Sequence, residues 1–224
     1  MPAKEIRILP SLLAADIGRL EEACRHAEAS GADGLHVDVM DGHFVRNLSM
    51  GPEVVRMARR CTRLPLSVHL MMTRPDWLLD AFVEAGSDTI LIHAEAHCDV
   101  RQTLRDIRQA GRRAGITLNP ETPAEAALGF KGEYDEILFM TVHPGFGGQS
   151  FIENVLPKMA TLRRALPDLD FSVDGGITAA TAARAAHAGV NIFLVGTWLF
   201  PPDGNMAGRL REMREAVRAA QAET

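Results

Sequence analysis

The sequence has few aromatic side chains and no excess of positive charge. Aromatic residues make up 5% of the 224 residues, but 46% are hydrophobic, so apolar material for a core is plentiful. The formal net charge of −5 excludes a protein that binds nucleic acid through bulk positive charge. No apolar run reaches the roughly 20 residues that a transmembrane helix needs. We therefore expect a globular protein that binds neither nucleic acid nor a membrane.

Cysteine is also scarce. The chain has three cysteines and no C-x-x-C pair: Cys24, Cys61 and Cys98. An odd number without such a pair is typical of reduced thiols in a cytoplasmic protein. The first residues resemble a signal peptide, because Lys4 and Arg7 accompany the apolar run Ile8–Ala15. That run is short, contains Pro10 and passes directly into an amphipathic segment, so we interpret it as a buried strand and its loop.

Short β-rich runs alternate with longer amphipathic runs along the chain. Eight runs predict strands: Ile6–Leu9, Gly34–Val39, Leu66–Leu70, Thr89–His93, Ile116–Asn119, Glu136–Val142, Asp170–Asp174 and Asn191–Gly196. The segments that predict helices include Ile17–Ala29, Trp77–Glu84, Val100–Arg113, Val155–Leu166, Ala179–His187 and Met206–Gln221. The predicted strands are nearly continuous apolar runs, which is typical of parallel strands buried on both faces.

Glycine recurs where a predicted helix passes into the next strand, at Gly31, Gly86, Gly115 and Gly189. Glycine suits the left-handed residue that ends a helix. Strands that alternate with helices form a parallel sheet with right-handed crossovers. Dividing 224 residues by eight strands gives 28 residues per unit. This predicts an α/β fold with a single (β/α)8 TIM barrel over residues 1–224, with an open doubly wound sheet as the alternative.

Ionisable residues stand at the carboxyl ends of three predicted strands, where barrel enzymes place their catalytic groups. His36 and Asp38 end the second strand, His69 ends the third and Asp174 ends the seventh. Imidazole and carboxylate groups together suit a borderline divalent ion such as Zn²⁺, Fe²⁺, Mn²⁺ or Co²⁺. Each residue alone also fits a structural role, as a hydrogen-bonded core histidine or a helix cap, and the spacing does not decide between these interpretations.

Glycine-rich loops follow the last three predicted strands. They contain Gly145-Phe146-Gly147-Gly148, then Gly175-Gly176, then Gly196-Thr197. Glycine lets backbone N–H groups approach an anion closely, and barrels of this kind bind phosphate after strands seven and eight. The first loop suits a mobile lid, although an ordinary flexible turn is the alternative. The only lysines are Lys4, Lys131 and Lys158, and none stands at a predicted strand end, which argues against a Schiff-base aldolase.

Four motifs in fixed order resemble the ribulose-phosphate 3-epimerase family over nearly the whole chain. They are VDVMDGHF (37–44), HLM (69–71), PGFGGQ (144–149) and VDGG (173–176). The resemblance implies a cytoplasmic isomerase of carbohydrate metabolism, an epimerase of the pentose phosphate pathway. Such an enzyme interconverts ribulose 5-phosphate and xylulose 5-phosphate with one bound divalent metal. Its implied partners are a small sugar phosphate and further copies of the chain in a homo-oligomer.

The resemblance also implies a role for each matching residue. The family's metal ligands fall on His36, Asp38, His69 and Asp174, and its acid and base fall on Asp38 and Asp174. Its substrate contacts fall on Ser11, His69, Gly145, Phe146, Gly147, Gly148, Gly175, Gly176, Gly196 and Thr197. Three methionines of the reacting centre match Met40, Met71 and Met140, for which plain core packing is the alternative.

The implied chemistry is consistent with these residue types. The C3 proton of the substrate lies next to the C2 carbonyl, so its removal gives an enediolate. A divalent metal stabilises that negative charge. Inversion at C3 needs a proton removed from one face and another delivered to the opposite face, which two carboxylates can perform.

Four residues depart from the family pattern and leave the substrate open: Ala14, Arg46, His143 and Trp198. One alternative is an epimerase of the same family that acts on a six-carbon ketose phosphate, such as allulose 6-phosphate. The other is a metal-independent phosphate-binding barrel. Related decarboxylases use an Asp-x-Lys-x-x-Asp run, but this chain reads Asp38-Val39-Met40-Asp41 and lacks that lysine.

Overall fold

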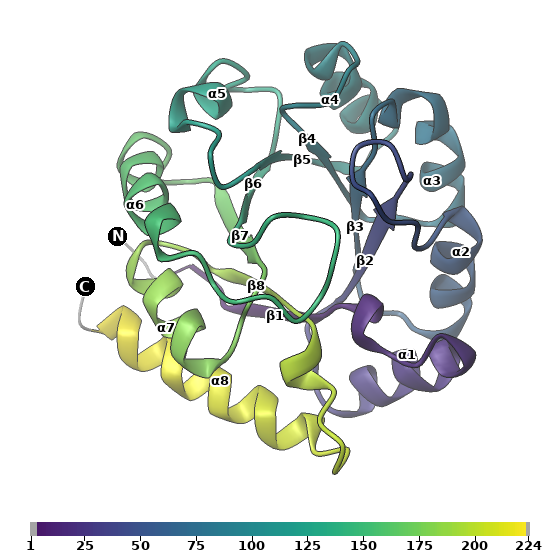
Figure 1. Ribbon diagram of the computed structural model, residues 1–224, viewed down its shortest axis with the longest axis vertical. Coiled ribbons are helices and arrows are strands. Elements are labelled where there is room, and N and C mark those ends of the chain that lie inside the picture. Colours follow the sequence, from purple (N-terminus) through teal and green to yellow (C-terminus); the bar gives the residue numbers. More distant parts are fainter. Residues whose placement is uncertain (1–3, 223–224) are drawn as a thin grey trace.

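Eight parallel strands form a ring, with the helices outside it, in the computed structural model, which describes residues 4–222 (Figure 1). The strands are β1 (Arg7–Pro10), β2 (Leu35–Met40), β3 (Leu66–Met71), β4 (Thr89–His93), β5 (Arg113–Leu118), β6 (Glu136–Met140), β7 (Asp170–Asp174) and β8 (Ile192–Val195). Neighbours pair in chain order from β2 to β8, and β8 pairs with β1. The predicted (β/α)8 barrel is therefore confirmed.

Among residues 4–222, eight α-helices cover the ring (Figure 1). They are α1 (Leu20–Ala29), α2 (Pro52–Cys61), α3 (Leu79–Ala85), α4 (Val100–Gln109), α5 (Ala124–Leu128), α6 (Leu156–Ala165), α7 (Ala179–His187) and α8 (Met206–Ala222). Helices α2 and α5 were not among the segments named from the sequence. Within residues 4–222, none of the helices has the length and apolar character that a membrane crossing requires.

The seam between β1 and β2 closes the ring with few hydrogen bonds. Ser11, directly after β1, forms a single parallel bridge with His36 of β2. Asp33 strengthens the seam, because its side chain accepts a hydrogen bond from the Ile8 N–H at 2.7 Å and its own N–H donates to the Ile8 carbonyl at 3.1 Å. The run after Arg7 is thus a buried strand followed by a loop, as predicted, and the seam places Ser11 beside the end of β2.

Two apolar layers fill the barrel. The larger one lies between the strands and the helices. A smaller one contains Leu9, Leu91, Leu138, Met140, Val142, Ile192 and Leu194. Strand residues alternate between the inside and the outside of the ring, and β1, β4, β6 and β8 contribute apolar residues to the smaller, inner layer. This explains why the strands read as continuous apolar runs in the sequence.

The prediction of a helix-ending glycine is wrong at one of the four positions. Positive φ angles confirm left-handed backbone at the other three: Gly31 (+86°), Gly86 (+101°) and Gly189 (+100°). Gly115 instead lies inside β5, which begins at Arg113, three residues before its predicted start. A Cβ atom on Gly115 would lie 2.1 Å from Leu91 Cδ2, so glycine here makes room for a side chain of β4. Helix α4 ends at Gln109 rather than at Arg113, and the left-handed glycine that follows it is Gly111.

The amino-terminal end of the barrel is held by an ionic network around Asp170, the first residue of β7. Its carboxylate accepts hydrogen bonds from Arg7, from Arg113 at 2.7 Å and from Asn191 at 3.1 Å. Burial alone would raise the pKa of Asp170, but the charge of Arg7 and the other donors lower it below the ordinary carboxyl value. The network therefore stabilises the fold when Asp170 is ionised.

We expect Asp170→Asn to lower the free energy of unfolding by about 2 kcal/mol at pH 7, because hydrogen bonds to charged groups contribute roughly 1.5–3 kcal/mol. Since the folded pKa is lowered, this stabilisation is present above the unfolded value and is lost as the pH falls through the folded value. The difference from wild type should therefore shrink below about pH 4. Urea unfolding at pH 7 and pH 3 measures this, with the exposed Asp168→Asn as control. An equal difference at both pH values would contradict the account.

Candidate functional site

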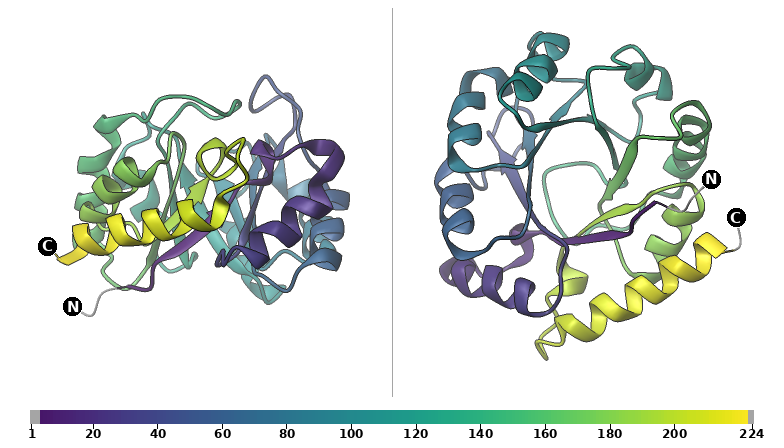
Figure 2. Two further views of the ribbon diagram at one scale, coloured as in Figure 1. Left: turned by 90° about the horizontal axis from the view of Figure 1, so that it is seen from below. Right: turned by 180° about the vertical axis from the view of Figure 1, so that it is seen from behind.

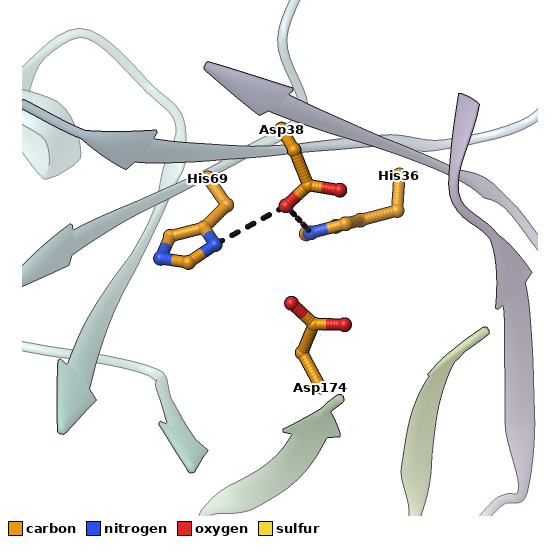
Figure 3. Close-up of side chains that lie close together, drawn as sticks. All are labelled: His36, Asp38, His69 and Asp174. Atoms are coloured by element: carbon orange, nitrogen blue, oxygen red, sulfur yellow. Dashed lines mark hydrogen bonds and ion pairs between the residues drawn. The ribbon is translucent and has the colours of Figure 1, made fainter. Parts of the chain in front are cut away.

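Four ionisable side chains meet at the carboxyl end of the barrel (Figure 3). His36 and Asp38 come from β2, His69 from β3 and Asp174 from the end of β7. One donor atom from each lies within 4.8 Å of the others, and all but Asp174 are fully buried. The structure thus brings together the four residues that the sequence singled out as metal ligands.

Asp38 is the centre of this cluster. Its Oδ1 lies 3.2 Å from His36 Nε2 and 3.4 Å from His69 Nδ1 (Figure 3). Its Oδ2 accepts a hydrogen bond from Ser11 Oγ at 2.5 Å. Burial would raise the pKa of Asp38, but the charge of His36 and its hydrogen bond lower the pKa well below its usual range. Asp38 is therefore ionised despite its burial.

Asp174 has the opposite electrostatic character. Figure 3 shows its carboxyl group pointing toward Asp38 from the other side of the site. Burial and the negative charge of Asp38 raise the pKa of Asp174 to about 7. Near neutral pH the pair therefore offers one ionised carboxylate and one carboxyl group that readily carries a proton, a separation typical of acid–base pairs.

The two histidines also differ. Burial would lower the pKa of His36, but the adjacent carboxylate of Asp38 raises it. Burial lowers the pKa of His69 to about 4, so its imidazole is neutral. The Nδ1 atom of His36 lies 3.2 Å from the hydroxyl of Ser67, which fixes the orientation of the ring.

The donor set fits a divalent ion. Ligands roughly 2.0–2.2 Å from one ion lie at most about 4.4 Å apart, close to the spacing found here. Two imidazole nitrogens and two carboxylates suit Zn²⁺, Fe²⁺, Mn²⁺ or Co²⁺ better than Ca²⁺, which prefers oxygen ligands. A cation would also compensate the two facing carboxylates, whose mutual repulsion raises the pKa of Asp174.

A cavity of about 660 Å³ opens beside this cluster. Its lining includes most of the predicted site residues: Ser11, Asp38, Gly145–Gly148, Asp174, Gly175, Gly176, Gly196 and Thr197. Met40, Met71 and Met140 are buried and also line the cavity, so core packing and a place beside the site hold together. His36 and His69 lie behind the cavity wall. Of the four residues, only Asp38 and Asp174 reach the cavity surface.

The loop that contains Gly145–Gly148 crosses the mouth of the barrel (Figure 1). Figure 2 shows it at the same end of the barrel as the loop after β2. The two loops are joined because Asn47 Nδ2 donates to the Gly145 carbonyl at 2.7 Å. Phe146 at its tip is 62% exposed, which leaves an apolar side chain free to cover a bound molecule.

Gly176 shows why glycine is required at the far side of the cavity. Its φ is +65°, and a Cβ atom there would lie 2.5 Å from the Phe151 nitrogen and 3.0 Å from the Gln149 carbonyl oxygen. Any side chain would clash with fixed backbone, so the peptide itself borders the cavity. Thr197, two residues after the end of β8, lies on the same wall and is exposed.

The departures from the family pattern lie at the rim. His143 Nε2 lies 2.7 Å from the Glu121 carboxylate. The guanidinium of Arg209 covers the ring of Trp198 at 4.8 Å, and Arg46 is exposed. The Cβ atom of Ala14 lies 3.7 Å from the position that a Cβ atom on Gly196 would take. None of the four contacts the His36, Asp38, His69 and Asp174 cluster.

Sequence reasoning missed a fifth residue, His93 at the end of β4. Its ring is fully buried and stacks on His69, with centroids 4.9 Å apart and an interplanar angle of 27°. The Nε2 atoms of the two rings are 2.9 Å apart. The signal was available, because His93 is an ionisable residue at a strand end, which is the criterion that found the other four.

Comparison with known proteins assigns the chain to a family. The family model described as the ribulose-phosphate 3 epimerase family matches residues 7–200. The chain belongs to this family. It is an enzyme, an isomerase of the epimerase class, as the resemblance of its motifs predicted.

Relatives and solved structures support this assignment. A ribulose-phosphate 3-epimerase of Bacillus subtilis is 42% identical over 200 residues, which cover 87% of this chain and 92% of the relative. One of Mycobacterium bovis is 42% identical over 217 residues, 95% of this chain and 94% of the relative. A 3-hexulose-6-phosphate synthase from Salmonella typhimurium superposes with a TM-score of 0.72 at 15% identity, covering 96% and 100% of the two chains, which shows the barrel fold alone.

The paired carboxylates give a pH prediction for the metal-free enzyme. We expect Asp174 to titrate near pH 7, because burial and the charge of Asp38 both disfavour its ionisation. Asp38→Asn removes the facing charge and should lower the pKa of Asp174. Carbon-13 NMR of carboxyl-labelled aspartates measures the pKa of Asp174 in the wild type and in the variant. A wild-type Asp174 that titrates near the ordinary carboxyl value would show that the two groups do not interact.

Proposed function

We propose that the enzyme inverts C3 of a ketose phosphate and interconverts D-ribulose 5-phosphate and D-xylulose 5-phosphate. The observation that carries the proposal is the pair Asp38 and Asp174, which face each other from β2 and β7 at the wall of the cavity. The Bacillus subtilis and Mycobacterium bovis relatives bear the name of this reaction. The motifs that contain both aspartates are those that carry the family resemblance.

The proton transfers follow from the two carboxyl groups. The ionised Asp38 removes the C3 proton from one face. The electron pair of the broken C–H bond forms a C2=C3 double bond, and the π electrons of the carbonyl move to the C2 oxygen, which gives an enediolate. Asp174 delivers its proton to the opposite face of C3, and the C2 carbonyl reforms. Asp38 is then protonated and Asp174 ionised, so the two exchange roles for the reverse reaction or reset through solvent.

His36, Asp38, His69 and Asp174 would hold the divalent metal. When bound, the ion supplies positive charge that stabilises the enediolate. Ser11 keeps the carboxylate of Asp38 oriented through the 2.5 Å hydrogen bond to its Oδ2. Met40, Met71 and Met140 give the cavity apolar walls, which exclude water from the reacting carbon.

The loops after β6, β7 and β8 would bind the phosphate. Gly176 and Gly196 bring backbone to the cavity surface, and Thr197 adds a hydroxyl. The loop Gly145–Gly148 would close over the substrate, with the side chain of Phe146 facing inward. Closure would order the exposed segment and shield the enediolate from solvent.

Solvent isotope incorporation tests the two-carboxylate mechanism. If Asp38 and Asp174 act on opposite faces, the proton removed is not the proton returned. In D₂O, early product should carry deuterium at C3 in nearly every molecule, and unreacted substrate should carry little. Transfer of the original proton into product would instead indicate one base that serves both faces. Mass spectrometry of both pools at low conversion measures this.

The variant Asp174→Asn sharpens that test. Asparagine keeps the size of the side chain but cannot donate a carboxyl proton, so epimerisation should be lost. Slow exchange of the C3 proton for solvent deuterium should remain in the epimer whose C3 proton faces Asp38. Metal content is measured in the same sample, because Asp174 is also a ligand. A metal-replete variant that epimerises at the parent rate would remove Asp174 from the mechanism.

A charge placed at Thr197 tests the phosphate loop. Thr197→Glu sets a carboxylate at the cavity wall, where it would repel the phosphate dianion. We expect KM to rise at least about tenfold, which corresponds to roughly 1.4 kcal/mol of binding. The conservative Thr197→Ser keeps the hydroxyl and should leave KM near the wild-type value. Equal KM values for the two variants would place the phosphate elsewhere.

A further inference from the structure

A chain of buried hydrogen bonds runs from the metal cluster toward the outside of the barrel. It begins at His69, whose Nδ1 faces Asp38 and whose Nε2 lies 2.9 Å from His93 Nε2. It continues from His93 Nδ1 to Glu95 Oε2 at 3.1 Å. Both rings are fully buried, so water does not compete for their nitrogens.

The groups at the outer end of this chain determine which atom donates and which accepts in each hydrogen bond. The Glu95 carboxylate accepts hydrogen bonds from the Asn119 N–H at 2.9 Å and from the Thr122 hydroxyl. Lys158 holds the same loop in place, because its ammonium donates to the carbonyls of residues 119, 120 and 122 at 2.9, 3.1 and 2.7 Å. A carboxylate with these donors on Oε1 is an acceptor, so His93 must donate from Nδ1 to Oε2.

This assignment then determines which nitrogen of each ring carries the proton. A neutral His93 that carries its proton on Nδ1 has a lone pair on Nε2, so it can only accept there. His69 must therefore donate from Nε2, which leaves the lone pair of its Nδ1 directed toward Asp38. The reverse arrangement would set the His93 Nδ1 lone pair against the Glu95 carboxylate at 3.1 Å. That contact between two acceptors is shorter than the 3.4 Å contact between His69 Nδ1 and Asp38 Oδ1 that the first arrangement leaves, and it lies away from the four-residue cluster, so a cation there would not relieve it.

We infer that His93 and Glu95 are positioning residues that hold His69 as the Nε2–H tautomer and present its Nδ1 lone pair to a divalent metal. The inference rests on the proposed function, which makes His69 a metal ligand. In the metal-free protein, His69 Nδ1 and Asp38 Oδ1 are two acceptors 3.4 Å apart, a contact that a cation between them relieves. Ligating histidines whose second nitrogen is held in this way bind metal more tightly.

The direct test reads the tautomer without metal. In the metal-free wild type with ¹⁵N-labelled histidine rings, a long-range ¹H–¹⁵N correlation spectrum distinguishes protonated from unprotonated ring nitrogens. We expect His69 to carry its proton on Nε2, with its signals assigned by their loss in His69→Gln. A proton on His69 Nδ1 would overturn the inference.

Three variants then test the effect on metal binding. Glu95→Gln keeps the shape of the side chain, but its amide has one oxygen to meet three donors, so it no longer fixes the proton of His93. His93→Leu removes the acceptor for His69 altogether. Both should weaken metal binding about 10–100-fold. His93→Gln restores an acceptor near the position of Nε2 and should recover most of the affinity, whereas the exposed His97→Leu is the matched control.

Dissociation constants for Co²⁺ and Zn²⁺, measured in competition with a chromophoric chelator, give the affinities. Circular dichroism shows that each variant is folded, and the wild-type spectrum decides the tautomer even where His93→Leu does not fold. Wild-type affinity in Glu95→Gln, with the His69 tautomer unchanged, would overturn this inference alone. A wild-type protein that binds neither ion would overturn the proposed metal site and this inference with it.

Discussion

The buried negative charge of Asp38 is the constraint on which the site depends. A carboxylate removed from water must be compensated by neighbouring donors or by a cation. Here Ser11 donates from the end of β1, and His36 approaches from β2. The same charge raises the pKa of Asp174 across the site, so one buried group sets the two facing carboxyl groups apart in pKa.

The barrel separates the facing carboxyl groups of Asp38 and Asp174, which are energetically unfavourable, from the parts that stabilise the fold. At the amino-terminal end, Asp170 is surrounded by arginine and asparagine donors, so its charge stabilises the fold. An apolar layer that includes Leu91, Leu138 and Leu194 lies inside the ring between the two ends. At the carboxyl end, two carboxyl groups face each other with incomplete compensation. The strands thus provide a rigid support on which an unfavourable but reactive pair can be held.

Much of this could be predicted from the sequence, because it depends on local pattern. Apolar runs located the strands to within a few residues, and the polar residues that end them include the four that meet in the structure. The wrong prediction at Gly115 and the omission of His93 both concern contacts between strands. Gly115 looked like a helix-ending glycine, but its role is to admit Leu91 of the adjacent strand. The position of His93 at a strand end could be read from the sequence, but its contact with His69 depends on the register in which His69 lies opposite Leu91, two residues before His93 on the same face.

The central claim is that the His36, Asp38, His69 and Asp174 cluster holds a divalent metal needed for inversion at C3. The most direct measurement is a coupled assay of turnover on ribulose 5-phosphate, with allulose 6-phosphate in parallel, before and after removal of metal by a chelator. The account predicts that activity on the five-carbon substrate is lost with the metal. It should return with Zn²⁺, Fe²⁺, Mn²⁺ or Co²⁺ but not with Ca²⁺. Full turnover by a protein shown by elemental analysis to be free of metal would contradict it.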